Sequence, residues 1–220
     1  MMQERFGDLR FPRGLYGVSP EWDDTERMID AVHAAAAGGM KAFQWRRKTA
    51  TPESAMKQAR RIVEVCRELG VVSIINDDWR LAALVDADGV HLGRDDGALT
   101  DARVALGPDR IIGCSCYNQP ELAELALKAD VDYMAFGAMY ASSVKPEAVR
   151  AGPEHLGQAQ RIVRSAGESP RAAVVAIGGI TPQNAHAVVA AGADSIAVIS
   201  GLFLAPDITA AARQCAALFE

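Results

Sequence analysis

The chain has 220 residues, 50% of them hydrophobic, and a formal net charge of −5 at pH 7. This composition can bury a full core, and the negative charge argues against a nucleic-acid-binding surface. No apolar run approaches the roughly 20 residues of a membrane span, and residues 1–13 are charged and lack the apolar stretch of a signal peptide. We therefore expect a cytoplasmic protein that binds neither nucleic acid nor membrane.

In the first half of the chain, short apolar runs alternate with helical segments that carry start and stop signals. Asp23-Asp24-Thr25 opens an alanine-rich helix, and Gly38-Gly39 ends it where a left-handed residue is needed. Thr51 is the expected N-cap of the next helix, with Pro52 at its first position and Gly70 at its end. The predicted strands are 15–18, 40–45, 71–76 and 89–92, and the predicted helices are 25–37, 52–69 and 79–85.

The second half repeats this alternation. The segment Asn118-Gln119-Pro120-Glu121 resembles a capping box, and Thr181-Pro182 is typical of another capped helix start. The predicted strands are 110–114, 132–136, 172–177 and 193–199, and the predicted helices are 98–106, 118–128, 153–166, one that begins at 181, and 207–219. A long loop is expected from 137 to 152.

Eight strand signals alternating with eight helical ones is the count of a (β/α)₈ barrel, the α/β architecture known as the TIM barrel. We predict a single TIM-barrel domain over residues 1–220, with residues 1–13 as an N-terminal extension. A doubly wound open sheet is the alternative fold. It is disfavoured because no G-x-G-x-x-G turn follows the first strand.

The cysteines and histidines give no zinc-ligand pattern. Cys114 and Cys116 would point to the same face of one strand, too close for an ordinary structural disulfide. We interpret the cysteines as reduced structural thiols and most histidines as structural or exposed; the residues concerned are Cys66, Cys114, Cys116, Cys215, His33, His91, His155 and His186.

Two of the predicted strands end in carboxylates. The run that begins at Val71 ends in Asn76-Asp77, and the next strand leads into Asp95-Asp96. If the strands are neighbours, Asp77 and Asp96 could converge on one Mg²⁺ ion, which takes oxygen ligands and is completed by water and substrate phosphate. The alternative is that Asn76-Asp77 caps the following helix and Asp95-Asp96 is a solvated turn.

Anion-binding groups follow other strands at the same rim, where the active site of a TIM barrel lies. Arg46 and Lys48 come directly after a strand and, beside Mg²⁺, would suit a pyrophosphate, although such a run can also be a solvated loop. Gly178-Gly179 and Ser200-Gly201 follow the last two strands, where many barrels hold a phosphate on backbone N–H groups. Two anion pockets indicate two phosphorylated substrates.

A set of motifs in order along nearly the whole chain resembles the thiamine-phosphate synthase family. Each motif is weak alone, and the set is specific. The motifs are Gln44-Trp45-Arg46-Arg47-Lys48, Ile75-Asn76-Asp77, the segment from Gly89 to Asp96, Ile112-Gly113-Cys114-Ser115, Phe136-Gly137 with Lys145-Pro146, Ala176-Ile177-Gly178-Gly179-Ile180 and Val198-Ile199-Ser200.

This resemblance implies a Mg²⁺-dependent transferase of thiamine biosynthesis. It would join hydroxymethylpyrimidine diphosphate to a thiazole phosphate, forming thiamine monophosphate and releasing pyrophosphate. In the family, the diphosphate leaves first and the thiazole nitrogen then captures the pyrimidine cation. No general base or covalent nucleophile is then required.

The resemblance also implies roles for individual residues. Asp77 and Asp96 would hold Mg²⁺. The pyrimidine diphosphate would be bound by Gln44, Trp45, Arg46, Arg47, Lys48, Asn76, Ser115 and Lys145, and the thiazole phosphate by Ser142, Ser143, Val144, Gly179, Ile199 and Ser200. The residues expected to act on the reacting groups are Arg46, Lys48, Ser115 and Lys145.

The chain departs from the family pattern at several positions. In the loop after the strand at 132–136, Gly137-Ala138 stands where Gly-Pro is usual. Val144 stands where a threonine is usual, so a hydroxyl expected near the thiazole phosphate is missing. Trp45 replaces an aliphatic residue, and we expect its ring to stack near the pyrimidine.

Three other activities compete with this interpretation. A related thiazole tautomerase shares the barrel, but Tyr117 follows Cys116 where that enzyme typically has a histidine. A Schiff-base aldolase would need a lysine within the strand at 132–136, which has none. A non-catalytic phosphate-binding barrel would not need the intact set of Asp77, Asp96, Arg46 and Lys145. The expected partners are small molecules, with a homo-oligomer as a possibility.

Overall fold

A computed structural model describes residues 7–141, 147 and 149–220, and it shows a closed barrel of parallel strands. The strands pair in sequence order, and the barrel closes where the first strand pairs with the last. This confirms the predicted TIM barrel. The strands are β1 Gly14–Val18, β2 Ala42–Trp45, β3 Val72–Asn76, β4 Gly89–Leu92, β5 Ile111–Tyr117, β6 Tyr133–Phe136, β7 Ala173–Ile177 and β8 Ser195–Val198.

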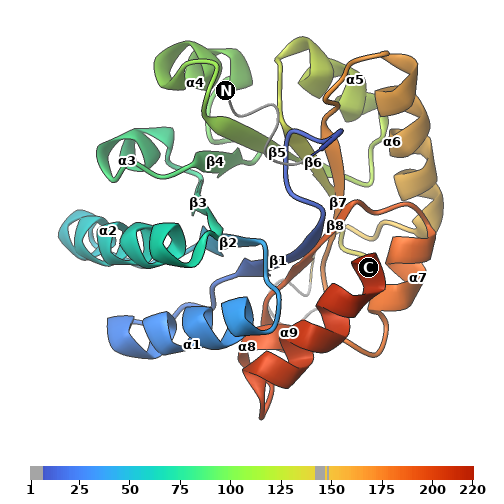
Figure 1. The fold of residues 1–220 in the computed structure, drawn as a ribbon. Coiled ribbons are helices and arrows are strands. Elements are labelled where there is room, and N and C mark those ends of the chain that lie inside the picture. The colour runs from blue at the N-terminus through green and yellow to red at the C-terminus, as the bar shows by residue number, and fades with distance from the viewer. Residues whose placement is uncertain (1–6, 142–146, 148) are drawn as a thin grey trace.

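Helices surround the strands as an outer ring, which Figure 1 shows in the view along the barrel. The first and last long helices, α1 and α9, pack together and close the ring. The helices are α1 Thr25–Ala37, α2 Pro52–Leu69, α3 Trp79–Leu84, α4 Leu99–Leu106, α5 Glu121–Lys128, α6 Pro153–Ser165, α7 Ala185–Ala190, α8 Ser200–Phe203 and α9 Ile208–Ala216, followed by the 3₁₀ turn η1 Ala217–Phe219.

Alternation along the strands divides the core into two layers, since successive side chains of a strand point to opposite faces. The larger layer lies between the strands and the helices and includes outward-facing residues such as Phe43, Val90 and Phe136. The smaller layer fills the barrel interior and includes Tyr16, Ile74 and other inward-facing residues. The strands are therefore nearly continuous apolar runs, as expected when both faces of a parallel sheet are covered.

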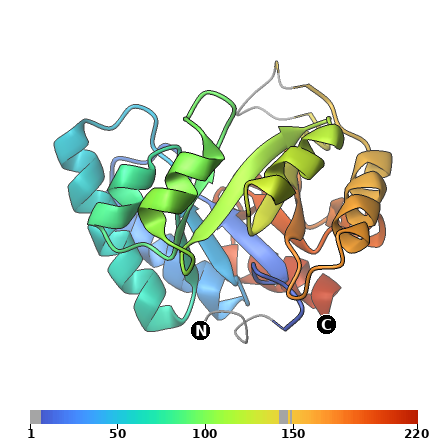
Figure 2. The same cartoon turned by 90° about the horizontal axis from the view of Figure 1, so that it is seen from above.

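The lower end of the barrel is closed by the segment that precedes β1. Leu9 and Phe11 are buried in the interior layer, and Leu9 forms a bridge with Arg171 just before β7. Figure 2 shows this dark-blue segment at the same end as the last helix. This part of the expected N-terminal extension therefore belongs to the core.

Most of the expected helix caps are present. Thr51 accepts a hydrogen bond from the N–H of Ser54, and Gly70 ends α2 in the left-handed conformation with φ of 67°. Asp24 and Asp207 cap α1 and α9 in the same way as Thr51. Local sequence signals therefore place these helix ends correctly.

Several element boundaries differ from the prediction by a few residues, and hydrogen bonding or strand pairing explains two of them. Strand β5 continues past the expected end because Tyr117 pairs with Phe136 after a register shift, and the following turn replaces the expected capping box. Helix α7 starts later than expected because the N–H of Thr181 donates to Asn184 Oδ1 and forms a turn before the helix. A short helix, α8, was not predicted.

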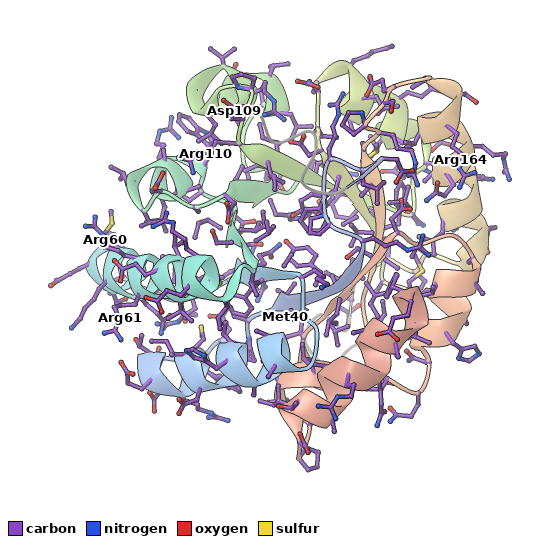
Figure 3. The ribbon with its side chains drawn as sticks, viewed as in Figure 1. Met40, Arg60, Arg61, Asp109, Arg110 and Arg164 are labelled. Atoms are coloured by element: carbon purple, nitrogen blue, oxygen red, sulfur yellow. The ribbon has the colours of Figure 1, made fainter. Side chains whose placement is uncertain are left out.

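Most charged side chains lie on the outside of the molecule (Figure 3), and the cysteines are reduced, as the sequence predicted. Figure 3 shows Arg60, Arg61 and Arg164 pointing away from the helical ring. All four cysteines are free and buried, and the Sγ atoms of Cys114 and Cys116 lie 3.9 Å apart. Within the part of the chain that the structure describes, no helix is both long and apolar enough to cross a membrane.

Candidate active site

A cavity of about 770 Å³ opens at the C-terminal ends of the strands. Its lining is divided by charge. The ends of β2, β3 and β4 and the loops after them contribute charged side chains, whereas the ends of β6, β7 and β8 contribute apolar ones. The charged residues on the first side are Arg46, Lys48, Asp77, Arg94, Asp95 and Asp96, and the apolar ones include Ala135, Ala138, Ile177, Ala197 and Ile199. Glu147, in the loop after β6, is the one charged residue that the described lining has on the apolar side.

The segment after β2 is held in place by two residues that follow β1. Ser19 is buried, and its Oγ accepts from the N–H of Arg46 at 2.7 Å and donates to its carbonyl at 3.0 Å. Glu21 accepts from the guanidinium of Arg46 at 3.2 Å and from the N–H of Lys48 at 3.0 Å. These contacts fix the backbone that carries two of the predicted diphosphate-binding side chains.

The side chain of Arg47 does not reach the cavity. Its guanidinium pairs with Asp23, in the segment between β1 and α1, and Arg47 is absent from the cavity lining. Because neighbouring residues in an extended segment point in opposite directions, Arg46 and Arg47 separate to different sides. The expected contact of the Arg47 side chain with the diphosphate is therefore not supported.

Trp45 also faces away from the cavity. It is 3% exposed, lies in the layer between the barrel and the helices, and donates through Nε1 to Gln58 Oε1 of α2 at 2.8 Å. Its neighbour Gln44 points into the barrel, so the outward direction of Trp45 follows from strand alternation. The expected stacking of Trp45 on a pyrimidine is wrong.

Asp77 and Asp96 lie together, as the sequence predicted. Nζ of Lys48 lies 2.9 Å from Asp77 Oδ2, and the two carboxyl groups interact with each other. Burial raises the pKa of Asp77, but hydrogen bonding to Lys48 and Asp96 outweighs it, so this pKa lies below its usual value. The pKa of Asp96 is raised, first by burial and then by the Asp77 carboxylate, although the N–H of Gly93 opposes this.

Of the two alternative roles considered for these carboxylates, capping by Asp77 is not what the structure shows, whereas residues 94–96 do form a turn in which Asp95 is exposed. Asp78, not Asp77, caps α3, with its carboxylate accepting from the N–H groups of Arg80 and Leu81. Asp96 Oδ2 accepts from the N–H of Gly93 at 2.7 Å and lies in the cavity lining. Both Asp77 and Asp96 are thus available at the cavity.

The remaining diphosphate-side residues line the cavity from three strands. Gln44, Asn76 and Ser115 lie near the C-terminal ends of β2, β3 and β5 and line the cavity. Ser115 Oγ is 2.9 Å from Nε2 of His91, which the sequence did not single out. These residues are brought together as predicted.

On the apolar side, only one of the described residues predicted to bind the thiazole phosphate lines the cavity itself. Ile199 lines the cavity, and the next residue, Ser200, begins α8. Gly179 has a φ of 63° and directly follows Gly178, which lines the cavity. An added Cβ at Gly179 would lie 2.4 Å from the carbonyl oxygen of Ala141, so only glycine fits there. Ser142, Ser143, Val144 and Lys145 lie outside the described residues.

A family profile described as thiamine monophosphate synthase matches residues 15–202, which is most of the barrel. The chain belongs to the thiamine monophosphate synthase family.

Relatives named thiamine-phosphate synthase match over nearly their full length. The protein from Bordetella avium is 57% identical over 211 residues, covering 96% of this chain and 97% of that one. The protein from Thiobacillus denitrificans is 47% identical over 209 residues, covering 95% and 96%. Family membership thus rests on the whole chain.

Solved structures agree with this family membership and with the barrel fold. Thiamine phosphate pyrophosphorylase from Pyrococcus furiosus superposes with a TM-score of 0.80 at 31% identity, covering 96% of both chains. A structure of 3-hexulose-6-phosphate synthase superposes with a TM-score of 0.68 at 15% identity, which is a likeness of fold alone.

The structure also adds cavity-lining residues that the sequence analysis missed. Arg94 lines the cavity and donates to Gln119 Oε1 at 2.9 Å, and its guanidinium lies 5.0 Å from the ring centre of Tyr117. His91 and Tyr16 line the cavity floor. Arg94 and His91 lie within the quoted segment from Gly89 to Asp96, so the signal for them was in the sequence. Tyr16 had no such signal.

Proposed function

We propose that this enzyme joins hydroxymethylpyrimidine diphosphate to a thiazole phosphate, forming thiamine monophosphate and releasing pyrophosphate. The observation that carries this assignment is the placement of the basic side chains that line the cavity on one side of it, whereas the opposite side is apolar apart from Glu147. A diphosphate fits the side that carries Arg46, Lys48 and Arg94. Two uncharged rings fit against the apolar ends of β6, β7 and β8.

The donor set at Asp77 and Asp96 supports a Mg²⁺ site. Among residues 7–141, 147 and 149–220, no group of three or more His, Cys, Asp or Glu side chains could hold a metal ion. Mg²⁺ does not need such a group, because it usually keeps several waters and takes one or two carboxylates plus substrate phosphate oxygens. Two interacting carboxylates beside an anion-binding surface fit this pattern, and bound Mg²⁺ would neutralise charge on the leaving diphosphate.

The side chains of this protein have to stabilise a leaving group rather than move a proton. Negative charge grows on the diphosphate as its bond to the pyrimidine methylene breaks. Arg46 and Lys48, positioned by Ser19 and Glu21, place positive charge on that side of the cavity, and Ser115 adds a hydroxyl. Fixed charges of this kind act without reorganising during the reaction. Lys145, from the sequence, completes this proposed set.

The thiazole phosphate is proposed to bind at Gly179, Ile199 and Ser200 with Ser142, Ser143 and Val144. Support comes from the position of Ile199 in the apolar wall and of the glycine turn after β7 beside it. The apolar wall and the turn are adjacent to the charged side, so the two substrates would meet in one cavity.

The deciding experiment incubates the purified protein with both substrates and Mg²⁺. We expect thiamine monophosphate and pyrophosphate in equal amounts, and neither product when one substrate is omitted. Isomerisation of the thiazole without coupling would favour the tautomerase. Binding of both compounds without any product would favour a non-catalytic barrel.

A further inference from the structure

A chain of hydrogen bonds crosses the floor of the cavity. Gln44 Nε2 donates to the phenol oxygen of Tyr16 at 2.6 Å, and this oxygen lies 2.8 Å from that of Tyr133. The Tyr133 oxygen lies 3.0 Å from Nδ1 of His91, and Nε2 of His91 lies 2.9 Å from Ser115 Oγ. Five side chains from five strands thus connect two proposed contacts of one substrate, Gln44 and Ser115.

The barrel makes room for this chain at Gly113. In the strand register, Gly113 of β5 lies between His91 of β4 and Tyr133 of β6. A Cβ at Gly113 would lie only 1.9 Å from Cζ of Tyr133, so the phenol ring occupies the space of the missing side chain. The rings of His91 and Tyr133 can then stack, with centroids 5.5 Å apart and planes 23° apart.

Tyr133 does not touch the cavity. Its side chain is fully buried, it is absent from the cavity lining, and Phe11 packs beneath it with ring centroids 4.2 Å apart. A substrate therefore has no contact with the Tyr133 hydroxyl. Any effect of this hydroxyl on the reaction must pass through its hydrogen-bond partners.

The available protons indicate which group donates in each hydrogen bond between Gln44 and Ser115. The Gln44 amide supplies the proton of the first bond, which leaves the Tyr16 hydroxyl proton for the bond to Tyr133. Tyr133 then donates to Nδ1 of His91, which leaves the imidazole proton on Nε2, facing Ser115. Burial raises the pKa of both tyrosines above the usual value, so both hydroxyls keep their protons near neutral pH.

We infer that Tyr16, Tyr133 and His91 are positioning residues that hold Ser115 as a hydrogen-bond donor to the substrate. With Nε2–H of His91 donating to Ser115 Oγ, the serine hydroxyl proton is directed into the cavity. This inference rests on the proposed role of Ser115 at the diphosphate. A donor suits a leaving group that gains negative charge, whereas a serine that gave its proton to His91 would present only lone pairs.

The first test reads the imidazole directly and needs no turnover. Nitrogen-15 NMR at mildly alkaline pH, with His91 assigned through His91→Gln, should show Nε2 protonated and Nδ1 accepting. Tyr133→Phe should add a signal from the opposite tautomer, because Nδ1 loses its donor. A proton on Nδ1 in the unmodified protein, whether alone or with Nε2, would overturn the inference even if the enzyme is fully active.

The second test is a double-mutant cycle on kcat/KM. Tyr133→Phe should lower it by roughly 3- to 12-fold, the worth of one neutral hydrogen bond. Ser115→Ala should lower it by about 100-fold. If Tyr133 acts through Ser115, the double variant should match Ser115→Ala within about twofold, because coupled residues are not additive. Losses that multiply, or an unchanged Tyr133→Phe, would refute the inference.

Phe11→Leu serves as the matched packing control. It perturbs the same rings and removes no hydrogen bond, so it should lower the unfolding temperature and leave the His91 tautomer unchanged. If Tyr133→Phe fails to fold, Tyr16→Phe breaks the chain one bond earlier and takes its place in the NMR test, where it should add a signal from the opposite tautomer. Tyr16 lines the cavity, so this variant is not used in the kinetic cycle. A wild-type enzyme that makes no thiamine monophosphate would refute the proposed function while leaving the NMR result valid.

Discussion

Nζ of Lys48 lies 2.9 Å from Oδ2 of Asp77, so a proposed diphosphate ligand is paired with a proposed metal ligand. The ammonium group and a bound Mg²⁺ ion would compete for the same carboxylate. Lys48→Met should therefore tighten divalent-metal binding several-fold while lowering turnover. A Mn²⁺ titration followed by electron paramagnetic resonance measures the first effect, and a coupled pyrophosphate assay measures the second. Weaker metal binding in Lys48→Met would show that the two cations do not compete.

The carboxylate pair should control metal dependence. Asp77→Asn and Asp96→Asn should each reduce turnover by about 100-fold or more, since each removes charge stabilisation of the leaving group. EDTA should abolish activity of the unmodified enzyme, and Mg²⁺ should restore it. The matched control is Asp101→Asn, because Asp101 is exposed on α4 and is absent from the cavity lining. A loss in Asp101→Asn equal to that in Asp96→Asn would contradict the assignment.

The acidic limb of the pH–rate profile should depend on Mg²⁺. The pKa of Asp96 is raised and that of Asp77 is lowered, so Asp96 takes up a proton first as the pH falls. Metal binding needs the ionised form, and higher Mg²⁺ should therefore move the limb to lower pH, by up to about one unit for each tenfold increase. Profiles of kcat/KM at several Mg²⁺ concentrations provide the measurement. A limb that stays at the same pH would mean that another group controls it.

Arg46 and Arg47 form a natural pair of test and control. Arg46 lines the cavity, whereas Arg47 pairs with Asp23 on the other side of the segment. Arg46→Gln should lower kcat more than it raises KM, by roughly 100-fold in total, because it removes stabilisation that grows in the transition state. Arg47→Gln should change either constant by less than about threefold. Equal defects would show that both guanidinium groups reach the substrate.

Trp45→Phe should affect stability and not catalysis. The change removes the hydrogen bond from Nε1 to Gln58 Oε1 and leaves a buried oxygen without that donor, which costs about 1–3 kcal/mol. Urea unfolding measures this cost, and steady-state kinetics should give nearly unchanged KM values for both substrates. A large rise in the KM of the pyrimidine diphosphate with normal stability would restore the stacking role.

Much of the fold is readable from the sequence because its signals are local. Apolar runs, Thr51-Pro52 and Gly70 each act within a few residues, and the structure places the strands and helices where these signals lie. The late start of α7 shows the limit of this approach. There, Asn184 Oδ1 accepts the N–H of Thr181, and this turn competes with the helix that Thr181-Pro182 would otherwise begin.

The site is predictable only in part, for a different reason. A motif such as the segment from Gln44 to Lys48 names neighbours, but alternation sends Gln44 inward and Trp45 outward. That separation could have been read from the period of a strand. The space at Gly113 could not, because it depends on the register of β5 against β6, which no local pattern encodes.

The outward direction of Trp45 has a practical consequence for optical experiments. The chain has three tryptophans, Trp22, Trp45 and Trp79, and none is among the described residues that line the cavity. All three pack against the layer between barrel and helices. Intrinsic fluorescence should therefore report the separation of helices from the barrel during unfolding and respond little to substrate. A binding assay for this enzyme needs a labelled ligand or calorimetry instead.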